Sequence, residues 1–148
     1  MRVLIVDDNE LLLEVAKATL AAAGFEVATS DSAVSFSKAL TESRPHIALV
    51  DVLMPGLNGN HLIEVARRQQ GRRKNDPNGE PAEALECAFV LHSNLPEADL
   101  QALAQRCGAR GFIRKSMHPR DLGGQLHEFL RREGISPIGV RSSTPSRR

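Results

Sequence analysis

The sequence is poor in aromatic residues. It contains no tryptophan and no tyrosine, and only 5 of its 148 residues are phenylalanine. Aliphatic side chains must therefore fill most of the core, which suits one domain because the chain is too short for two ordinary ones. No apolar run approaches the roughly 20 residues of a membrane-spanning helix, and residues 1–2 lead directly into a strand-like run rather than a signal peptide. We therefore expect a cytoplasmic protein without membrane association.

Neither sign of charge is in excess, and the formal net charge is +1 at pH 7. This balance gives no reason to expect nucleic acid as a partner, and the basic run within residues 67–74 is interpreted as a solvated face. Cys87 and Cys107 lack CxxC spacing, which favours reduced, buried thiols over a disulfide framework or a metal site. The histidines share no ligand spacing, so we assign no chemistry to His46, His61, His92, His118 and His127.

Short apolar runs alternate with segments of helical periodicity along residues 1–132, which we interpret as one domain. The apolar runs predict strands at residues 3–6, 25–29, 46–50, 88–91 and 111–115. The periodic segments predict helices at residues 11–23, 33–40, 62–68, 100–107 and from 119 onward. Strict alternation implies right-handed crossovers, and hence an α/β fold with a doubly wound, five-stranded parallel sheet covered by helices on both faces.

Four segments interrupt this pattern. Residues 54–59 hold a proline and two glycines and are predicted to be a loop, and the polar residues 71–86 are predicted to be mostly a mobile loop. The pair Gly123-Gly124 lies inside the last predicted helix, where each glycine costs about 1 kcal/mol relative to alanine, so we expect local softness. Residues 133–148 are rich in serine, proline and arginine, which predicts a disordered basic tail.

Three aspartates stand at the ends of two predicted strands. Asp7 and Asp8 follow the strand at 3–6, and Asp51 follows the strand at 46–50. In parallel sheets ligands collect beyond the carboxyl ends of the strands, so the three carboxylates are expected to meet there. Crowded like charges are tolerable only with raised pKa values or a bound cation. An oxygen-only site of this kind suits Mg²⁺.

These acids belong to a larger set of motifs. Residues 6–9 read Val-Asp-Asp-Asn, residues 51–55 read Asp-Val-Leu-Met-Pro with Gly59 after them, Ser93 closes the fourth predicted strand, and Lys115 closes the fifth. In this order and spacing, the set resembles the receiver domains of two-component response regulators, over about residues 1–132. The resemblance implies the flavodoxin-like strand order 2-1-3-4-5.

The resemblance also implies a phosphoryl-transfer function. Asp51 would accept a phosphoryl group from a histidine kinase or a phosphotransfer protein, forming an acyl phosphate without a general base. Such transfer depends on positioning and on charge neutralisation, which Mg²⁺ would supply. By analogy, Asp8, Asp51 and the backbone carbonyl of Leu53 bind the metal directly, and Asp7 binds it through a water.

A switch is implied by the same likeness. Lys115 would pair with the phosphoryl oxygens, and the Ser93 hydroxyl would bond one of them. In receivers an aromatic side chain, here Phe112, turns inward as the hydroxyl moves. This changes the surface made by the last strand and the last two helices, where a downstream protein binds and where two copies could form a homodimer. No output domain follows in this chain, so we expect a single-domain regulator of the chemotaxis or phosphorelay type.

Some positions depart from the usual pattern of the family. Ser116 follows Lys115 where a proline with a cis peptide bond is usual; a cis bond before serine would cost about 3 to 4 kcal/mol, so we expect a trans bond. Asn94 follows the switch serine where a small residue is usual, which alters phosphodonor access or the switch. Leu53 and Leu95 can overhang the phosphoryl group without orienting a water, which predicts slow self-hydrolysis.

Two other functions compete with the signalling switch. The first is a degenerate receiver that docks a protein without phosphorylation, motivated by Ser116 and Asn94, although the acids and Lys115 are intact. The second is an enzyme of the haloacid dehalogenase type, which places a second acid two residues after its nucleophile, where this chain has Leu53. A flavodoxin is excluded because the acidic crevice repels the FMN phosphate. We therefore expect no turnover enzyme, but a phosphoacceptor that promotes its own phosphorylation and slow dephosphorylation.

Overall fold

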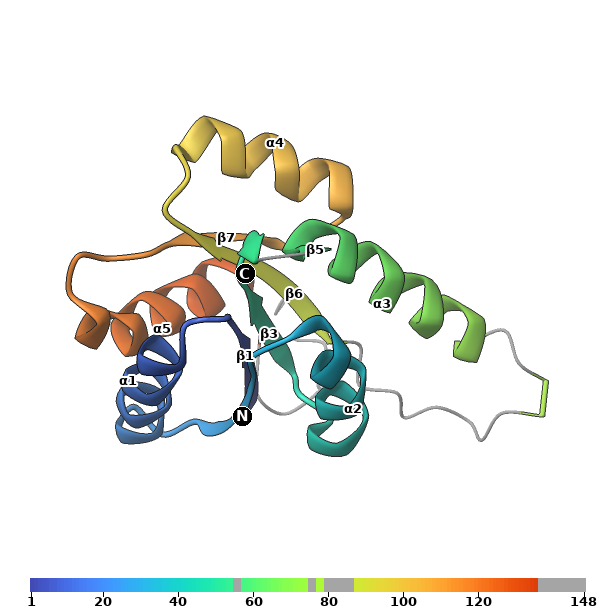
Figure 1. Cartoon of the computed structure of the whole chain (residues 1–148), viewed down its shortest axis with the longest axis horizontal. Helices are drawn as coiled ribbons and strands as arrows, with labels where there is room; N and C mark the ends of the chain where they lie inside the picture. Colours follow the sequence, from blue (N-terminus) through green and yellow to red (C-terminus); the bar gives the residue numbers. More distant parts are fainter. Residues whose placement is uncertain (55–56, 75–76, 79–86, 136–148) are drawn as a thin grey trace, which may run out of the picture.

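A five-stranded parallel sheet forms the centre of the chain (Figure 1). The computed structural model describes residues 1–54, 57–74, 77–78 and 87–135. The strand order is β2-β1-β3-β6-β7, and all of its pairings are parallel. The strands are β1 (Arg2–Val6), β2 (Glu26–Ser30), β3 (Ile47–Val50), β6 (Ala88–Ser93) and β7 (Gly111–Arg114). The predicted fold class and strand order are confirmed, with β6 and β7 as the fourth and fifth predicted strands.

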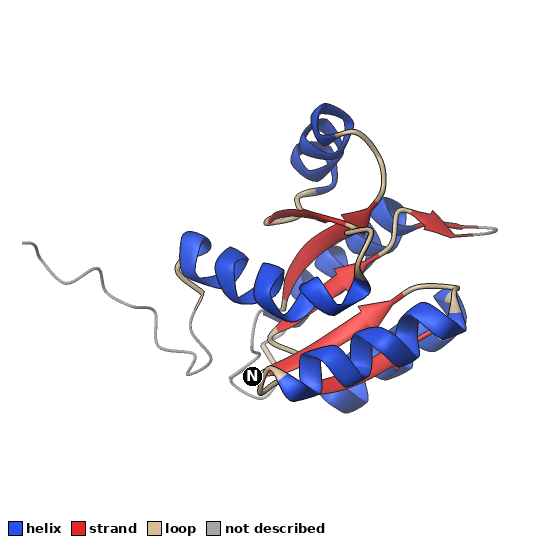
Figure 2. Cartoon of the chain, turned by 90° about the vertical axis from the view of Figure 1, so that its left-hand side faces the viewer, coloured by secondary structure: helices blue, strands red, loops and turns tan. Residues whose placement is uncertain are grey.

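Helices cover both faces of the sheet (Figure 2). They are α1 (Glu10–Ala22), α2 (Ala33–Ser43), α3 (Gly59–Lys74), α4 (Glu97–Cys107), the 3-10 turn η1 (Pro119–Asp121) and α5 (Leu122–Glu133). Successive strand residues point to opposite faces. Val3 and Ile5 of β1 therefore pack in the layer under α1 and α5, and Leu4 and Val6 pack in the layer under α2, α3 and α4.

Two segments differ from the sequence prediction. Within residues 54–59, predicted as a loop, β4 (Leu53–Met54) and β5 (Leu57–Asn58) pair as antiparallel strands. Strands of two residues carry no alternation that a sequence pattern could reveal. The helix α3 continues to Lys74, so the loop predicted over 71–86 is wrong for residues 71–74. Arginine and lysine have high helix propensity, which extends the helix although these residues carry no apolar periodicity. Residues 77–78 form a turn, and the rest of that loop lies outside the described residues.

The described chain ends shortly after α5. Gly134 has a left-handed backbone with φ 66°, which terminates the helix. Ile135 then packs against the core layer under α1 and α5. The tail was predicted to begin at residue 133, but Glu133 ends α5 and Ile135 packs on the core. Residues 136–148 lie outside the described residues, so their disorder stays a prediction.

Cys87 and Cys107 are buried free thiols, as the sequence predicted. Burial raises the pKa of the Cys87 thiol to about 12, and burial also raises the pKa of Cys107. Thiolates are the reactive form of cysteine, so both side chains act as small hydrophobic groups of the core.

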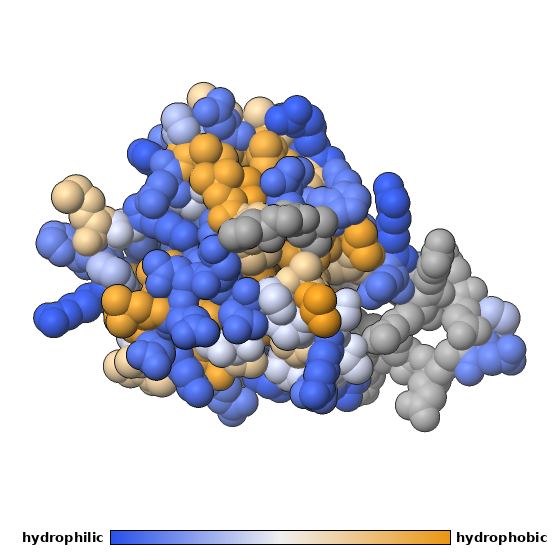
Figure 3. Space-filling view, in the orientation of Figure 1, coloured by the Kyte–Doolittle hydropathy of each residue, from blue (hydrophilic) through white to orange (hydrophobic). Residues whose placement is uncertain are grey.

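The described surface is mixed in character. Figure 3 shows one face, on which hydrophobic groups lie among hydrophilic side chains. Within the part of the chain that the structure describes, no helix is both long enough and apolar enough to cross a membrane.

The two adjacent glycines of α5 have different environments. The helix runs through both without interruption from Leu122 to Glu133. A Cβ atom on Gly123 would lie 3.0 Å from the Cβ of Ala23 and 3.4 Å from the backbone oxygen of Thr19, whereas a Cβ atom on Gly124 would meet nothing within 4 Å. Gly123 therefore permits the close approach of α5 to α1, and Gly124 has no such role.

The alanine variants of the two glycines should differ in stability. Gly124→Ala should raise the free energy of unfolding by about 0.5–1 kcal/mol, the helix preference of alanine over glycine. Gly123→Ala should gain less, because its methyl group crowds Ala23, and Gly123→Val should destabilise the fold. Denaturant unfolding followed by circular dichroism measures all three. Equal gains from both alanine variants would contradict the packing role of Gly123.

Candidate functional site

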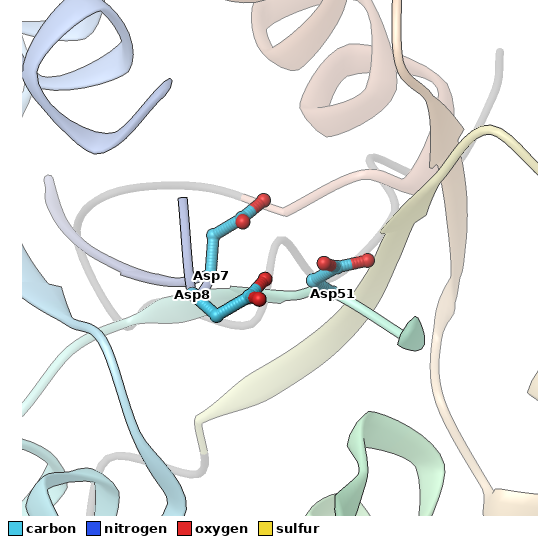
Figure 4. A group of neighbouring side chains, drawn as sticks. All are labelled: Asp7, Asp8 and Asp51. Carbon is cyan, nitrogen blue, oxygen red and sulfur yellow. The ribbon is translucent and has the colours of Figure 1, made fainter. Parts of the chain in front are cut away.

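The sheet register brings the three predicted aspartates together. Val6 of β1 pairs with Val50 of β3, and the ladder continues beyond the strands because the N–H of Asp51 donates to the Val6 oxygen (2.9 Å). One carboxylate oxygen from each of Asp7, Asp8 and Asp51 lies within 4.8 Å of the others. Figure 4 shows Asp7 and Asp8 at the end of β1 and Asp51 at the end of β3. The acids therefore form one cluster at the carboxyl end of the sheet.

The cluster is buried on one side and open on the other. Asp7 and Asp51 are 1% and 4% exposed, whereas Asp8 is exposed. Burial raises the pKa of Asp51, and the nearby Asp7 carboxylate adds to that effect, while Lys115 opposes it. A ligand can therefore approach two buried carboxylates from the side of Asp8.

Backbone donors hold the two buried carboxylates in place. Asp7 Oδ1 accepts the N–H of Asn9 (2.9 Å), and Asp51 Oδ1 accepts the N–H of Leu53 (3.2 Å). Each carboxylate thus uses one oxygen for the loop that follows its strand. The second oxygen, Oδ2, remains for the centre of the site.

Lys115 supplies a positive charge to those second oxygens. It follows β7, and its backbone N–H donates to the Ser93 oxygen (2.9 Å), which extends the ladder between β6 and β7. Its Nζ donates to Asp7 Oδ2 at 2.8 Å and lies 3.5 Å from Asp51 Oδ2. The residue that the sequence predicts at the end of the fifth strand therefore reaches both buried acids. The Lys115 ammonium pairs with two of the three carboxylates, so it does not balance the charge of the whole cluster when all three are ionised.

Gly59 at the start of α3 allows a close backbone approach. A Cβ atom at this position would overlap the backbone oxygen of Asp51, and the Gly59 N–H donates to the Val52 oxygen (3.2 Å). Gly59 is part of the sequence motif, but the motif alone does not explain why a glycine stands there. In the structure, only glycine lets the first turn of α3 lie against the backbone of Asp51.

Ser93 is buried at the end of β6, and its Oγ accepts the N–H of Leu95 (3.2 Å). This bond closes the turn after the strand, which is the structural role that a hydroxyl here often has. A hydroxyl that accepts one bond can still donate another, so the contact leaves Ser93 a donor for a ligand. Phe112 is half-buried against the core layer under α2, α3 and α4. No cis peptide bond occurs among the described residues, so the bond before Ser116 is trans, as predicted.

His92 lies beside this site and was assigned no chemistry from the sequence. It precedes Ser93 on β6, is 4% exposed, and lines a small cavity with Leu12, Ala16, Ser116, Pro119, Leu122 and Gln125. Burial, and to a smaller extent the charge of Lys115, lower the pKa of His92 to about 4, while Asp7 opposes the shift. The only sequence signal is a histidine within an apolar strand, which does not distinguish a neutral core residue from a ligand.

Comparison with known proteins gives a consistent result. A family model described as the response regulator receiver domain matches residues 3–127. The DNA-binding response regulator MtrA of Mycobacterium tuberculosis (strain ATCC 25618 / H37Rv) is 28% identical over 141 residues, which cover 95% of this chain and 55% of that protein. The transcriptional regulatory protein GltR of Pseudomonas aeruginosa is 28% identical over 138 residues, with 92% and 51% covered. The chain therefore spans about half the length of these curated relatives.

Solved structures share the fold. The chemotaxis protein CheY4 of Vibrio cholerae matches with a TM-score of 0.69 and 21% identity, covering 88% of this chain and 96% of that one. The BeF3-activated N-terminal receiver domain of RstA from Klebsiella pneumoniae matches with a TM-score of 0.68 and 21% identity, covering 88% and 99%. At these identities, the likeness concerns the arrangement of strands and helices.

The depressed pKa of His92 should make stability depend on pH. The unfolded chain binds a proton at His92 near pH 6.5, whereas the folded chain does so only near pH 4. The free energy of unfolding should therefore fall as the pH drops from about 6.5 toward 4, by up to about 1.4 kcal/mol per pH unit from this group. His92→Leu should remove this part of the slope in denaturant unfolding between pH 7 and 5. Identical slopes for both proteins would contradict a buried neutral His92.

Proposed function

This chain belongs to the response regulator receiver domain family, and we propose that Asp51 is the residue at which it accepts a phosphoryl group. Receiver domains are phosphoacceptors in two-component signalling, so the class of function follows from the family. The donor we propose is a phosphohistidine on a histidine kinase or a phosphotransfer protein. The observation that carries the assignment is the place of the Asp51 carboxylate, with Oδ1 fixed by Leu53 and Oδ2 3.5 Å from the ammonium of Lys115.

The transfer needs no base, because a deprotonated carboxylate is already the nucleophile. Asp51 Oδ2 would attack phosphorus as the bond from phosphorus to the donor nitrogen breaks, leaving an acyl phosphate on Asp51. The raised pKa of Asp51 works against the reactive form, and Lys115 opposes that effect. Phosphoryl transfer depends mainly on positioning and on stabilisation of the phosphoryl oxygens, and we propose that Lys115 contributes to both.

The donor atoms of the cluster fit Mg²⁺. Asp7, Asp8 and Asp51 offer only carboxylate oxygens within 4.8 Å of one another, and Mg²⁺ prefers oxygen ligands. We propose that Asp8, Asp51 and the Leu53 carbonyl bind it directly and that Asp7 does so through a water. When bound, the ion would neutralise charge on the carboxylates and on the incoming phosphoryl group.

Phosphorylation adds about −1.5 to −2 charge beside Lys115 and Ser93, and we propose that this drives the switch. Lys115 would shift from Asp7 toward the new phosphoryl oxygens, and Ser93 would donate its hydroxyl to one of them. Phe112 packs behind this strand end, so the surface of α4, β7 and α5 would change in response. We propose that a protein partner binds this surface in the cytoplasm and that the same surface can serve as the interface of a homodimer.

We propose no nucleic acid partner for the described residues. The curated relatives named as DNA-binding or transcriptional regulators are about twice as long as the region matched. The described receiver residues form a phosphoacceptor fold, and the site that we assign lies at the carboxyl end of its sheet.

Phosphorylation by a small donor tests the proposed function. Wild-type protein incubated with acetyl phosphate and Mg²⁺ should gain a single phosphoryl group by intact mass, because Asp51 Oδ2 lies beside Lys115 and the proposed Mg²⁺ site. The adduct should be absent without Mg²⁺ and absent in Asp51→Asn. Loss of the adduct in Asp51→Asn but not in the matched variant Asp31→Asn identifies the position. An unmodified wild-type protein with several donors would instead favour phosphorylation-independent docking.

The lifetime of the phosphorylated form should be long and should depend on Leu53. The Leu53 side chain is 60% exposed two positions after Asp51 and offers no polar group to orient water. Leu53→Asn should therefore shorten the half-life of the acyl phosphate several-fold, whereas the apolar variant Leu53→Met should leave it near the wild-type value. Decay followed by intact mass after donor removal measures this. Decay within seconds in the wild type, slowed by Leu53→Asn, would overturn the assignment.

A further inference from the structure

We propose that Ser116 and Asp121 form a hydrogen-bonded pair that positions Lys115 in the site. The inference rests on the proposed function, since it concerns how the Lys115 ammonium is held at Asp7 and Asp51. The pair lies in the segment that follows β7 and includes η1, which we call the Lys115 loop (residues 115–121). Neither Ser116 nor Asp121 touches the carboxylate cluster directly, so both are positioning residues.

The hydroxyl of Ser116 makes two bonds within this loop. It donates to Asp121 Oδ2 at 2.8 Å, and it accepts the N–H of His118 at 3.1 Å. The N–H of Asp121 in turn donates to the His118 oxygen (2.9 Å). The residue directly after Lys115 is therefore bonded both to its own turn and to the end of η1.

Hydrogen bonds also hold the backbone at Lys115 and at the residue before it. The Lys115 N–H donates to the Ser93 oxygen (2.9 Å), and the Arg114 oxygen accepts Nε2 of Gln125 on α5 (3.1 Å). Lysine has a long flexible stem, so where its ammonium rests depends on the backbone that carries it. Bonds on both sides of Lys115 fix that backbone, and Nζ then reaches Asp7 at 2.8 Å.

Asp121 precedes α5 and could instead have served as its cap. An aspartate at this position commonly accepts an N–H from the first turn of the helix. Here Asp121 has a helical backbone and makes no side-chain capping bond, and its carboxylate turns to Ser116. The bond from Ser116 therefore takes the place of a helix-capping bond. The Asp121 carboxylate thus stabilises the Lys115 loop rather than the first turn of α5.

Because the Ser116–Asp121 pair is near the surface, its role in positioning Lys115 can be tested separately from any role in folding. Asp121 is exposed and Ser116 is half-buried, so their bond is open to competition from water. Breaking it should change the melting temperature little, while it frees the Lys115 loop to move. A defect should then appear in the reaction that uses Lys115 rather than in stability.

The test compares phosphorylation rates of the full chain with acetyl phosphate and Mg²⁺. Ser116→Ala and Asp121→Ala should each slow phosphorylation of Asp51 about fivefold or more, and the double variant should be no slower than either single one. Ser116→Thr and Asp121→Asn keep a hydroxyl donor and an oxygen acceptor, so both should stay near the wild-type rate. Melting temperatures measured alongside should remain close together.

A double-mutant cycle with Lys115→Met tests whether Ser116 affects the phosphorylation rate through Lys115. In the Lys115→Met background, Ser116→Ala should produce no further slowing, because the side chain that it positions is gone. A wild-type rate in both Ser116→Ala and Asp121→Ala, or equal slowing with and without Lys115, would overturn the inference. Failure of the wild type itself to be phosphorylated at Asp51 would instead remove the proposed function.

Discussion

The repulsion among Asp7, Asp8 and Asp51 is the constraint on which the site depends. Three carboxylates have oxygens within 4.8 Å of one another, and the ammonium of Lys115 pairs with two of them, Asp7 and Asp51. At low effective dielectric, such crowding is costly unless protons or cations balance it. Burial is the main cause of the raised pKa of Asp51, and repulsion from Asp7 adds to it. The features of the site can be understood as responses to that excess charge. The backbone donors to Asp7 and Asp51 fix one oxygen of each, and the remaining oxygens are left for cations.

The fold holds this arrangement because its backbone leaves the acids few alternatives. The parallel ladder places Asp51 beside the end of β1 through the bond to the Val6 oxygen. Gly59 lets α3 begin against the backbone of Asp51, and Gly123 lets α5 approach α1 closely. The central strands β1, β3 and β6 are buried on both faces, and a shift of their register would displace hydrophobic side chains from their packing. The three carboxylates repel one another, and the packing of the strands and helices keeps them together.

Much of the fold and of the acid cluster could be predicted from the sequence, because strand ends and periodic helices leave local signals. The positions of Asp7, Asp8, Asp51 and Lys115 follow from five apolar runs and their order, and the parallel sheet then brings the first three together. Other features depend on contacts between distant residues. The Ser116 to Asp121 bond was not foreseen, since a serine after the lysine signalled only the absence of a proline.

Local signals also failed where packing decided the outcome. The extension of α3 to Lys74 lacks an apolar stripe, and the pairing of β4 with β5 is too short to show alternation. The pair Gly123-Gly124 was interpreted as softness, yet only the structure distinguishes the glycine that packs on Ala23 from the one that packs on nothing. His92 gave no usable signal, because its neutral state depends on burial against α1 and α5.

The central claim is our proposal that the acid cluster binds Mg²⁺, and a direct titration with this ion tests it. The chain has no tryptophan or tyrosine to report by fluorescence, so calorimetry is the suitable method. The account predicts one Mg²⁺ bound per chain, with affinity reduced at least tenfold in Asp8→Asn and in Asp51→Asn. Binding that is absent in the wild type, or unchanged in both variants, would contradict it.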